Sequence, residues 1–235
     1  ENQYDYVLVS IIESGRLMPA HVADLLRLYV IYHYGGIYLD ASIILLDSLD
    51  WIHEYNQKGY DLIMYKNTMH TTIKSNPVLE NWFIASYPKC PFIGLSLEKL
   101  IDVFSHSDLN NELSKLLSDK NVNYQNFANH GTYHLAYFVF IYIFQKHFKN
   151  GINNALFLDC ENDPKKLICS YLAYYGVENK SQLSLFDYPI TDDEYKIIES
   201  QKMVKLIGIN RGDIDKAQIV YNSFMYRLLK KLDIK

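Results

Sequence analysis

The sequence has few cysteines and no long hydrophobic run. It contains three cysteines in 235 residues, with no CxxC pair and no Cys/His spacing typical of zinc, so neither a disulfide scaffold nor a structural zinc site is predicted. The most apolar stretch, residues 133–144, is shorter than the ~18 apolar residues that a bilayer span needs. No basic and apolar leader follows Glu1, so no signal peptide is predicted. We therefore expect a soluble protein in a reducing, cytoplasmic compartment.

Positive charge is not in excess either. Lys and Arg number 23 against 27 Asp and Glu, a net charge of −4, which argues against a nucleic-acid partner because phosphate contacts need a surplus of basic residues. The motifs GxxxxGK[ST], GxGxxG, GxSxG and HExxH are missing. His130 and His134 are four residues apart, but without a third ligand they indicate a structural pair rather than a metal site.

Apolar residues, in contrast, are plentiful. They make up 49% of the chain, enough for a sizeable core. Pro19 suits the first turn of a helix and Gly35-Gly36 suits its end, so a helix is predicted over residues 19–34. The apolar run 37–46 predicts a buried strand that is interrupted by Asp40-Ala41-Ser42. Further strands are predicted at 60–66, 155–159 and 203–209, and further helices at 76–86, 95–104, 110–117, 133–149, from Asp163 onward and at 217–232.

Alternating helices and strands predict an α/β fold. We expect a mainly parallel central sheet flanked by helices, in a single domain over residues 1–235.

Two charged residues stand out in the predicted helix 19–34. Apolar residues cover every face of this helix, which predicts that it is buried. Its only formal charges, Asp24 and Arg27, are three residues apart and so share a face. Burying unpaired charges is costly. Two interpretations follow: a structural ion pair, or a polar pair that holds a hydroxyl-rich ligand in a cleft.

Asp40 lies in a run that is too apolar for a surface loop. In open α/β sheets, ligands bind at the carboxyl ends of strands. Mg²⁺ or Mn²⁺ on a diphosphate takes only one or two protein carboxylates. The structural alternative is an aspartate that caps a turn. Together with Asp24, Arg27 and the double glycine, Asp40 indicates a ligand-binding carboxylate.

The segments HVADLLR at 21–27 and YGGIYLDASI at 34–43 resemble the signature of the capsular polysaccharide synthesis glycosyltransferases. These are relatives of the DXD sugar-binding glycosyltransferases, which include mannosyltransferase-like and clostridial-toxin glucosyltransferase-like enzymes. LENWFIA at 79–85 and VKL at 204–206, followed by Asn222-Ser223-Phe224, are also similar to this family. The resemblance implies a GT-A-like nucleotide-sugar-binding fold, here without the strand with which such relatives usually begin.

The resemblance also implies an activity and roles for single residues. It implies transfer of a sugar, with retention of configuration, from a nucleotide-sugar donor, a UDP-sugar being favoured. Asp24 and Arg27 would hydrogen-bond the donor sugar, and Asp40 would meet the diphosphate or the ribose. Mn²⁺ or Mg²⁺ would be held by Asp40 and, through water, by Ser42, which replaces the second acidic residue of the family. Further substrate-binding residues implied are Tyr38, Asn81, Trp82 and Lys205, the last beside the leaving diphosphate.

These roles have structural alternatives. Tyr38 and Trp82 also suit a core, and Lys205 also suits a solvated surface. The expected acceptor is a polysaccharide or a lipid-linked precursor. The alternative functions are a toxin-like transferase that glycosylates a protein hydroxyl and a degenerate, non-catalytic nucleotide-sugar-binding module. Basic residues near the C-terminus, Arg227, Lys230 and Lys231, indicate either a solvated face or a peripheral contact with anionic lipid at the inner membrane face.

Overall fold

The computed structural model describes residues 3–161, 189–205, 219, 221 and 223–231. The chain forms two compact units. The larger unit comprises Glu1–Leu39 and Asp50–Asp159, and the smaller unit comprises Asp40–Leu49 and Cys160–Lys235. None of the helices in the described residues is long and apolar enough to span a membrane.

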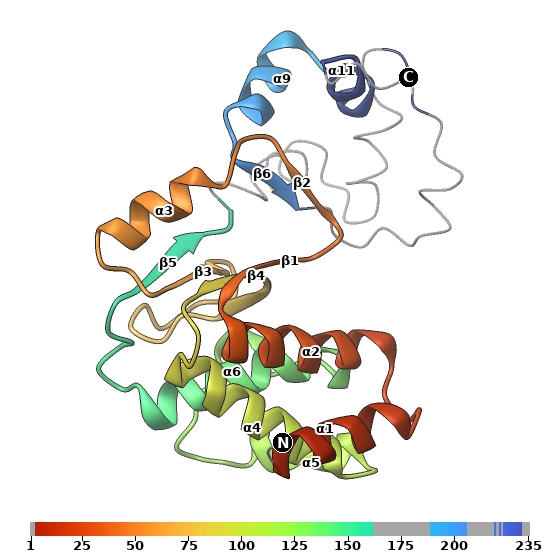
Figure 1. Ribbon diagram of the computed structural model, residues 1–235, viewed down its shortest axis with the longest axis vertical. Coiled ribbons are helices and arrows are strands. Elements are labelled where there is room, and N and C mark those ends of the chain that lie inside the picture. Colours follow the sequence, from red (N-terminus) through yellow and green to blue (C-terminus); the bar gives the residue numbers. More distant parts are fainter. Residues whose placement is uncertain (1–2, 162–188, 206–218, 220, 222, 232–235) are drawn as a thin grey trace. The chain divides into compact units, whose positions relative to one another are not determined.

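A four-stranded sheet forms the centre of the larger unit (Figure 1). Its order is β1 (Gly36–Leu39), β4 (Leu79–Ser86), β3 (Leu62–Lys66), β5 (Ala155–Asp159). β4 is antiparallel to β1 and to β3, and among these strands only β3 and β5 are parallel. The mixed α/β class is confirmed, but the prediction of a mainly parallel sheet is wrong. The loop 67–78 between β3 and β4 contains no helix, so the chain returns antiparallel, whereas β5 follows a helical crossover.

β4 also occupies residues for which a helix was the prediction. Asn76-Pro77 is typical of a helix start, and a short apolar run fits a buried helix and a buried strand equally well. The aromatic and β-branched residues at 82–84 suit a strand. All but one of the eight residues of β4 are buried, because β4 lies between two neighbouring strands and is covered by helices.

A bulge interrupts the pairing of β4 with β3. Ile84 pairs with Met64 and Leu79 pairs with Lys66, so β4 advances five residues while β3 advances two. Extra residues in one strand bend it and re-aim its side chains, and such bulges are frequent beside active sites. Residues 80–83, which include Asn81 and Trp82, lie in this bulge.

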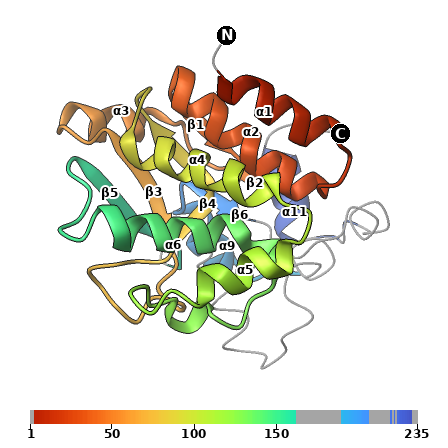
Figure 2. The ribbon, with the colours of Figure 1, turned by 90° about the horizontal axis from the view of Figure 1, so that it is seen from below.

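Helices α2 (Pro19–Tyr34), α4 (Pro91–Ser105) and α6 (Leu135–His147) lie together on one side of the sheet (Figures 1 and 2). Helix α5 (Leu109–Leu117) packs against α4 and α6, and α1 (Gln3–Glu13) packs against α4. Helix α3 (Asp50–Gln57) lies on the other side of the sheet, where Trp51 stacks on Phe83 of β4.

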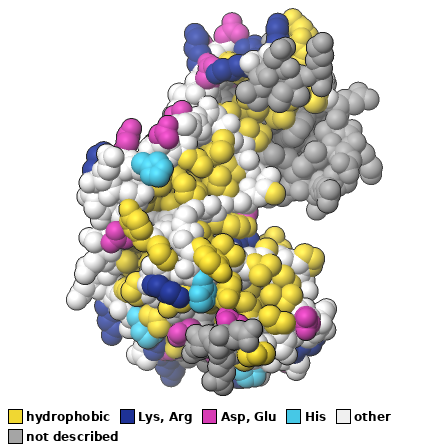
Figure 3. Space-filling view, in the orientation of Figure 1, with side chains coloured by type: hydrophobic (Ala, Val, Ile, Leu, Met, Phe, Trp, Pro, Cys, Tyr) yellow, Lys and Arg dark blue, Asp and Glu magenta, His cyan; other side chains and the backbone are white. Residues whose placement is uncertain are grey.

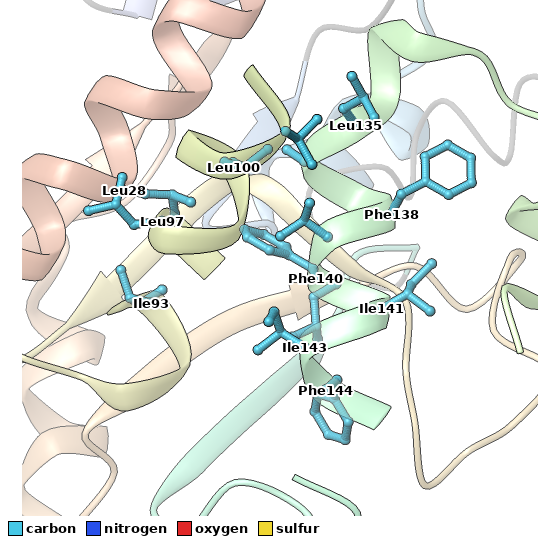
Figure 4. Packing of buried hydrophobic residues seen from close by; sticks show 14 of the residues in the cluster. Leu28, Ile93, Leu97, Leu100, Leu135, Phe138, Phe140, Ile141, Ile143 and Phe144 are labelled. Carbon is cyan, nitrogen blue, oxygen red and sulfur yellow. The ribbon is translucent and has the colours of Figure 1, made fainter. Parts of the chain in front are cut away.

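The core of the larger unit lies between α2, α4 and α6. Figure 4 shows Leu28 of α2 next to Leu97 of α4. Phe140 of α6 packs on Phe92 of α4, with ring centroids 5.4 Å apart. Complete burial of a side chain of this size stabilises the fold by about 1.5–3 kcal/mol. The predicted buried helix at 133–149 is therefore confirmed, within the narrower bounds of α6 and a preceding 3₁₀ turn at Thr132–His134.

Gly35 ends α2 as predicted and turns the chain into β1. Its φ is +67°, and its N–H donates to the Ile31 carbonyl at 2.8 Å. A Cβ at this position would lie 2.8 Å from Cδ of Pro88 and 2.9 Å from the carbonyl oxygen of Ser86. Both the backbone conformation and the lack of space therefore require glycine.

The smaller unit contains a two-stranded antiparallel sheet of β2 (Ile43–Leu45) and β6 (Met203–Lys205). The run 37–46 is thus two strands in different sheets, and neither β1 nor β2 is fully buried. Helices α9 (Asp192–Glu199) and α11 (Phe224–Lys231) complete the described part of this unit. Its apolar cluster contains Ile190, Val204, Phe224 and Leu228.

Two of the three basic residues of α11 are paired with acidic side chains. Arg227 pairs with Asp192 at 2.9 Å, and Lys231 pairs with Glu199 at 2.6 Å. Figure 3 shows Lys, Arg, Asp and Glu side chains interspersed over this end of the smaller unit. The positive charges on which the lipid hypothesis depends are therefore partly offset within the unit.

The remaining element predictions divide into three groups. The strand at 155–159 is confirmed with its predicted bounds, and the strand at 60–66 and the helices at 95–104 and 110–117 are confirmed with shifted ends. The terminal helix begins at Phe224, later than predicted, because residues 219, 221 and 223 are not helical. The helix from Asp163, residues 206–209 of the late strand, and Asn222 lie outside the described residues.

Candidate functional site

Four residues of the larger unit form what we call the arginine cluster: Asp24, Arg27, Tyr38 and Asn81. Nη2 of Arg27 lies 3.3 Å from Oδ1 of Asp24, one turn away on α2. Nη1 of Arg27 donates to the Asn81 carbonyl at 2.7 Å, and Nδ2 of Asn81 donates to Oδ1 of Asp24 at 2.9 Å. The guanidinium carbon lies 4.6 Å from the centre of the Tyr38 ring. Helix α2, β1 and the bulge of β4 thus meet through one ion pair.

Helix α2 buries both of its charged residues together with its apolar face, while some of its apolar residues are exposed. Asp24 and Arg27 are 4% and 7% exposed, whereas Leu26 and Val30 are 43% and 48% exposed. The expectation that every face of α2 is buried is therefore wrong. The ion pair expected by the structural interpretation is present, and the bulge supplies its partner Asn81.

The other predicted residues of this unit differ in their exposure. Tyr38 and Asn81 are half-buried, so the arginine cluster reaches the surface at these two side chains. Trp82 is 3% exposed, and its indole N–H donates to Oε2 of Glu80 at 2.6 Å.

Three residues of the smaller unit form the lysine cluster: Asp40, Ser42 and Lys205. Nζ of Lys205 donates to Oδ2 of Asp40 at 2.8 Å and to Oγ of Ser42. The pairing of β2 with β6 places Lys205 opposite Ile43, directly after the turn that carries Asp40 and Ser42. Residues more than 160 positions apart in sequence thus meet, as the resemblance implies.

The lysine cluster does not fit the expected Mn²⁺ or Mg²⁺ in this arrangement. The ammonium of Lys205 is hydrogen-bonded to Oδ2 of Asp40 and to Oγ of Ser42, so a divalent cation held by these two side chains would lie beside a like charge. Across the described residues, no three His, Cys, Asp or Glu side chains are placed to hold a metal ion.

Glu80 was not singled out from the sequence, yet it organises the bulge of β4. It is 2% exposed and accepts three hydrogen bonds from different elements. Tyr137 of α6 and Trp82 each donate to Oε2 at 2.6 Å, and Asn67 donates to Oε1 at 2.9 Å. The available signal was a carboxylate inside an otherwise apolar run, because such a group must be hydrogen-bonded to be buried.

The buried His21 and the half-buried His134 lie at the 3₁₀ turn before α6, and His134 is the last residue of that turn. Nε2 of His21 donates to the Thr132 carbonyl at 2.9 Å, which leaves Nδ1 deprotonated in the neutral ring. Burial lowers the pKa of His21, although the Thr132 carbonyl acts in the opposite direction. Burial also lowers the pKa of His134, assisted by the positive charge that His130 and His70 acquire and opposed by Glu80.

Stability is therefore expected to fall in acid. The unfolded chain protonates these histidines near their ordinary pKa of 6.5, whereas the folded chain holds them neutral to lower pH. The free energy of unfolding should be constant above this pH and should decrease as the pH falls below it. Urea denaturation at several pH values measures this slope. His134→Gln should flatten it, and the control His53→Gln, on an exposed position of α3, should not.

The comparisons with known proteins agree with the sequence signature. Residues 4–173 match the family described as capsular polysaccharide synthesis protein. No curated protein and no solved structure is significantly similar to the chain. The match covers more than half of the 235 residues and includes the arginine cluster, Asp40 and Ser42, while Lys205 lies beyond it. The chain therefore belongs to the capsular polysaccharide synthesis protein family.

Proposed function

We propose that this protein is a glycosyltransferase that moves a sugar from a nucleotide-sugar donor, with a UDP-sugar favoured, to a polysaccharide or lipid-linked acceptor. The observation that carries the proposal is the lysine cluster. A cation held by an aspartate and a serine within a family signature for polysaccharide synthesis suits the diphosphate of such a donor.

The chemistry requires stabilisation of a leaving diphosphate. In the transfer, the bond between the anomeric carbon and the diphosphate oxygen breaks, and its electron pair stays on the diphosphate. The acceptor hydroxyl forms the new bond to that carbon and loses its proton. Lys205 offsets the charge that develops on the leaving group, and Asp40 and Ser42 hold its ammonium in place. Removing one preorganised contact of this kind typically lowers the rate by ~10²–10³-fold.

The arginine cluster has a separate task in this proposal. Within the larger unit, Tyr38 and Asn81 are half-buried and offer hydroxyl and amide groups to which a sugar can bind. Asp24 and Arg27 are almost completely buried and fix the amide of Asn81 and the ring of Tyr38. Sugar hydroxyls are both donors and acceptors, so a fixed amide that offers both suits them.

Donor binding is the first test. A panel of UDP-, GDP-, ADP- and CMP-sugars should include at least one that raises the melting temperature, because a ligand at about 100 times its Kd adds ~2.7 kcal/mol to the stability of the folded state. Asp40→Asn should abolish most of this gain. The matched control Asp47→Asn, an exposed acid of the same unit whose carboxylate accepts from the Ser48 N–H, should keep it.

The same panel separates the alternatives. Binding and slow hydrolysis of a donor support a transferase, whereas binding without hydrolysis or transfer to any acceptor favours a non-catalytic module. Transfer to a protein hydroxyl in place of a glycan favours the toxin-like alternative. If no donor shifts the melting temperature, with or without metal, the proposed function is wrong.

A further inference from the structure

We propose that the ammonium of Lys205 takes the place of the divalent cation, so that the protein binds its donor without a metal. This inference rests on the proposed function, because it specifies how the same lysine cluster meets a diphosphate. It departs from the metal dependence that the resemblance implies.

The position of Lys205 is the first argument. Its side chain is 10% exposed, and its ammonium donates to both Asp40 and Ser42, the two residues expected to hold the metal. The register of β2 and β6 fixes this position, because Lys205 pairs with Ile43, the residue that follows Ser42. The backbone pairing of the two strands therefore fixes the position of Lys205, which a surface loop would not do.

The charge balance of the cluster is the second argument. A divalent cation between two carboxylates is neutral, because two positive charges meet two negative ones. An ammonium between one carboxylate and one hydroxyl is also neutral. With Ser42 at the second position, the ammonium of Lys205 offsets the carboxylate of Asp40, and a divalent cation added beside it would lie next to a like charge.

The ligand chemistry is the third argument. Mg²⁺ prefers near-octahedral oxygen coordination at about 2.0–2.1 Å, a geometry that a hydrogen-bonding ammonium does not need. An ammonium instead donates hydrogen bonds at longer distances, as the 2.8 Å contact with Asp40 does. Lysine is also an established phosphate-binding residue that acts as a point charge.

The first experiment uses the unaltered protein. Binding of the donor identified by the panel is measured by calorimetry in EDTA and again in Mn²⁺, and Mn²⁺ binding is measured directly from the electron paramagnetic resonance signal of the free ion. We expect the Kd of the donor to change less than about twofold between the two buffers. We also expect no stoichiometric Mn²⁺ binding in the absence of donor.

The second experiment exchanges the two cations. Lys205→Met removes the charge and keeps much of the side-chain volume, and it should weaken donor binding in EDTA by roughly tenfold or more, as expected for a lost charge-assisted hydrogen bond. The double variant Ser42→Asp with Lys205→Met restores two carboxylates without the ammonium. It should acquire Mn²⁺ binding, and its donor binding should then require Mn²⁺. Lys196→Met is the matched control, because Lys196 lies in the same unit and is also paired, with Asp193.

Two results would overturn the inference. One is a Kd for the donor that improves tenfold or more when Mn²⁺ replaces EDTA in the unaltered protein. The other is stoichiometric Mn²⁺ binding to the unaltered protein that Asp40→Asn abolishes. Both results can be obtained without any Lys205 variant, so they do not depend on whether such a variant folds. If no nucleotide-sugar binds in either buffer, the proposed function itself fails, and the inference fails with it.

Discussion

Replacing Arg27 with methionine is expected to lower the free energy of unfolding of the larger unit by about 3–5 kcal/mol, because it breaks a buried ion pair and leaves a charge behind. Asp24, which is 4% exposed, would lose the guanidinium of Arg27 as its partner. The substitution also removes the donor to the Asn81 carbonyl and the cation above the Tyr38 ring. Urea denaturation monitored by circular dichroism measures the loss.

A matched control separates burial from charge. Lys99 and Asp102 of α4 have the same spacing as Asp24 and Arg27, but their side chains are 28% and 54% exposed. Lys99→Met should therefore cost only ~0.2–1 kcal/mol, the usual range for a pair in contact with solvent. If Arg27→Met and Lys99→Met lower the free energy of unfolding equally, the buried ion pair contributes no more to stability than the exposed one.

Glu80→Ala is also expected to lower the free energy of unfolding of the larger unit, as Arg27→Met does. The Glu80 substitution removes the acceptor of the buried Trp82 indole N–H and of two half-buried donors, Asn67 and Tyr137. A buried polar group left without a partner costs about 1–3 kcal/mol, so a loss of at least this size is expected. Glu80→Gln should cost less, because its amide oxygen can still accept from Trp82 and Tyr137.

Fluorescence reports on the same network without unfolding. The chain has two tryptophans, so Trp51→Phe leaves Trp82 as the single emitter. In that background, Glu80→Gln should change the emission of Trp82, whose indole N–H donates to Glu80. The control is Glu112→Gln, since Glu112 is also buried but is paired with the exposed Lys115. Unchanged emission in the Glu80 variant would contradict the network.

The elements that could be predicted are those whose signals are local. Helix α2 begins at Pro19 and ends at Gly35 as expected, because proline fixes the first turn and only glycine fits the last. β4 could not be predicted in this way. Its state depends on pairing with β1 and β3, which are distant in sequence, and its apolar run has no period that separates a strand from a helix.

The contacts of the candidate site also depend on residues that are distant in sequence. The meeting of Lys205 with Asp40 followed from a resemblance over the whole signature, because no local pattern connects residues 165 positions apart. The partnership of Asn81 with Asp24 depends on the bulge of β4, which no sequence period encodes. The hydrogen bonds of Glu80 join three elements, so its role was visible only once those elements were placed.

The bulge of β4 makes this segment sensitive to its length as well as to its side chains. A point substitution at 80–83 changes one side chain, but deletion of one residue shifts every later residue of β4 against β1 and β3 or shortens the bulge. Side chains alternate between the two faces of a strand, so such a shift turns each of them to the opposite face. Asn81 would then leave Asp24, and core residues such as Ile84 would exchange places with their neighbours. Functional members of the family should therefore keep the number of residues in this segment.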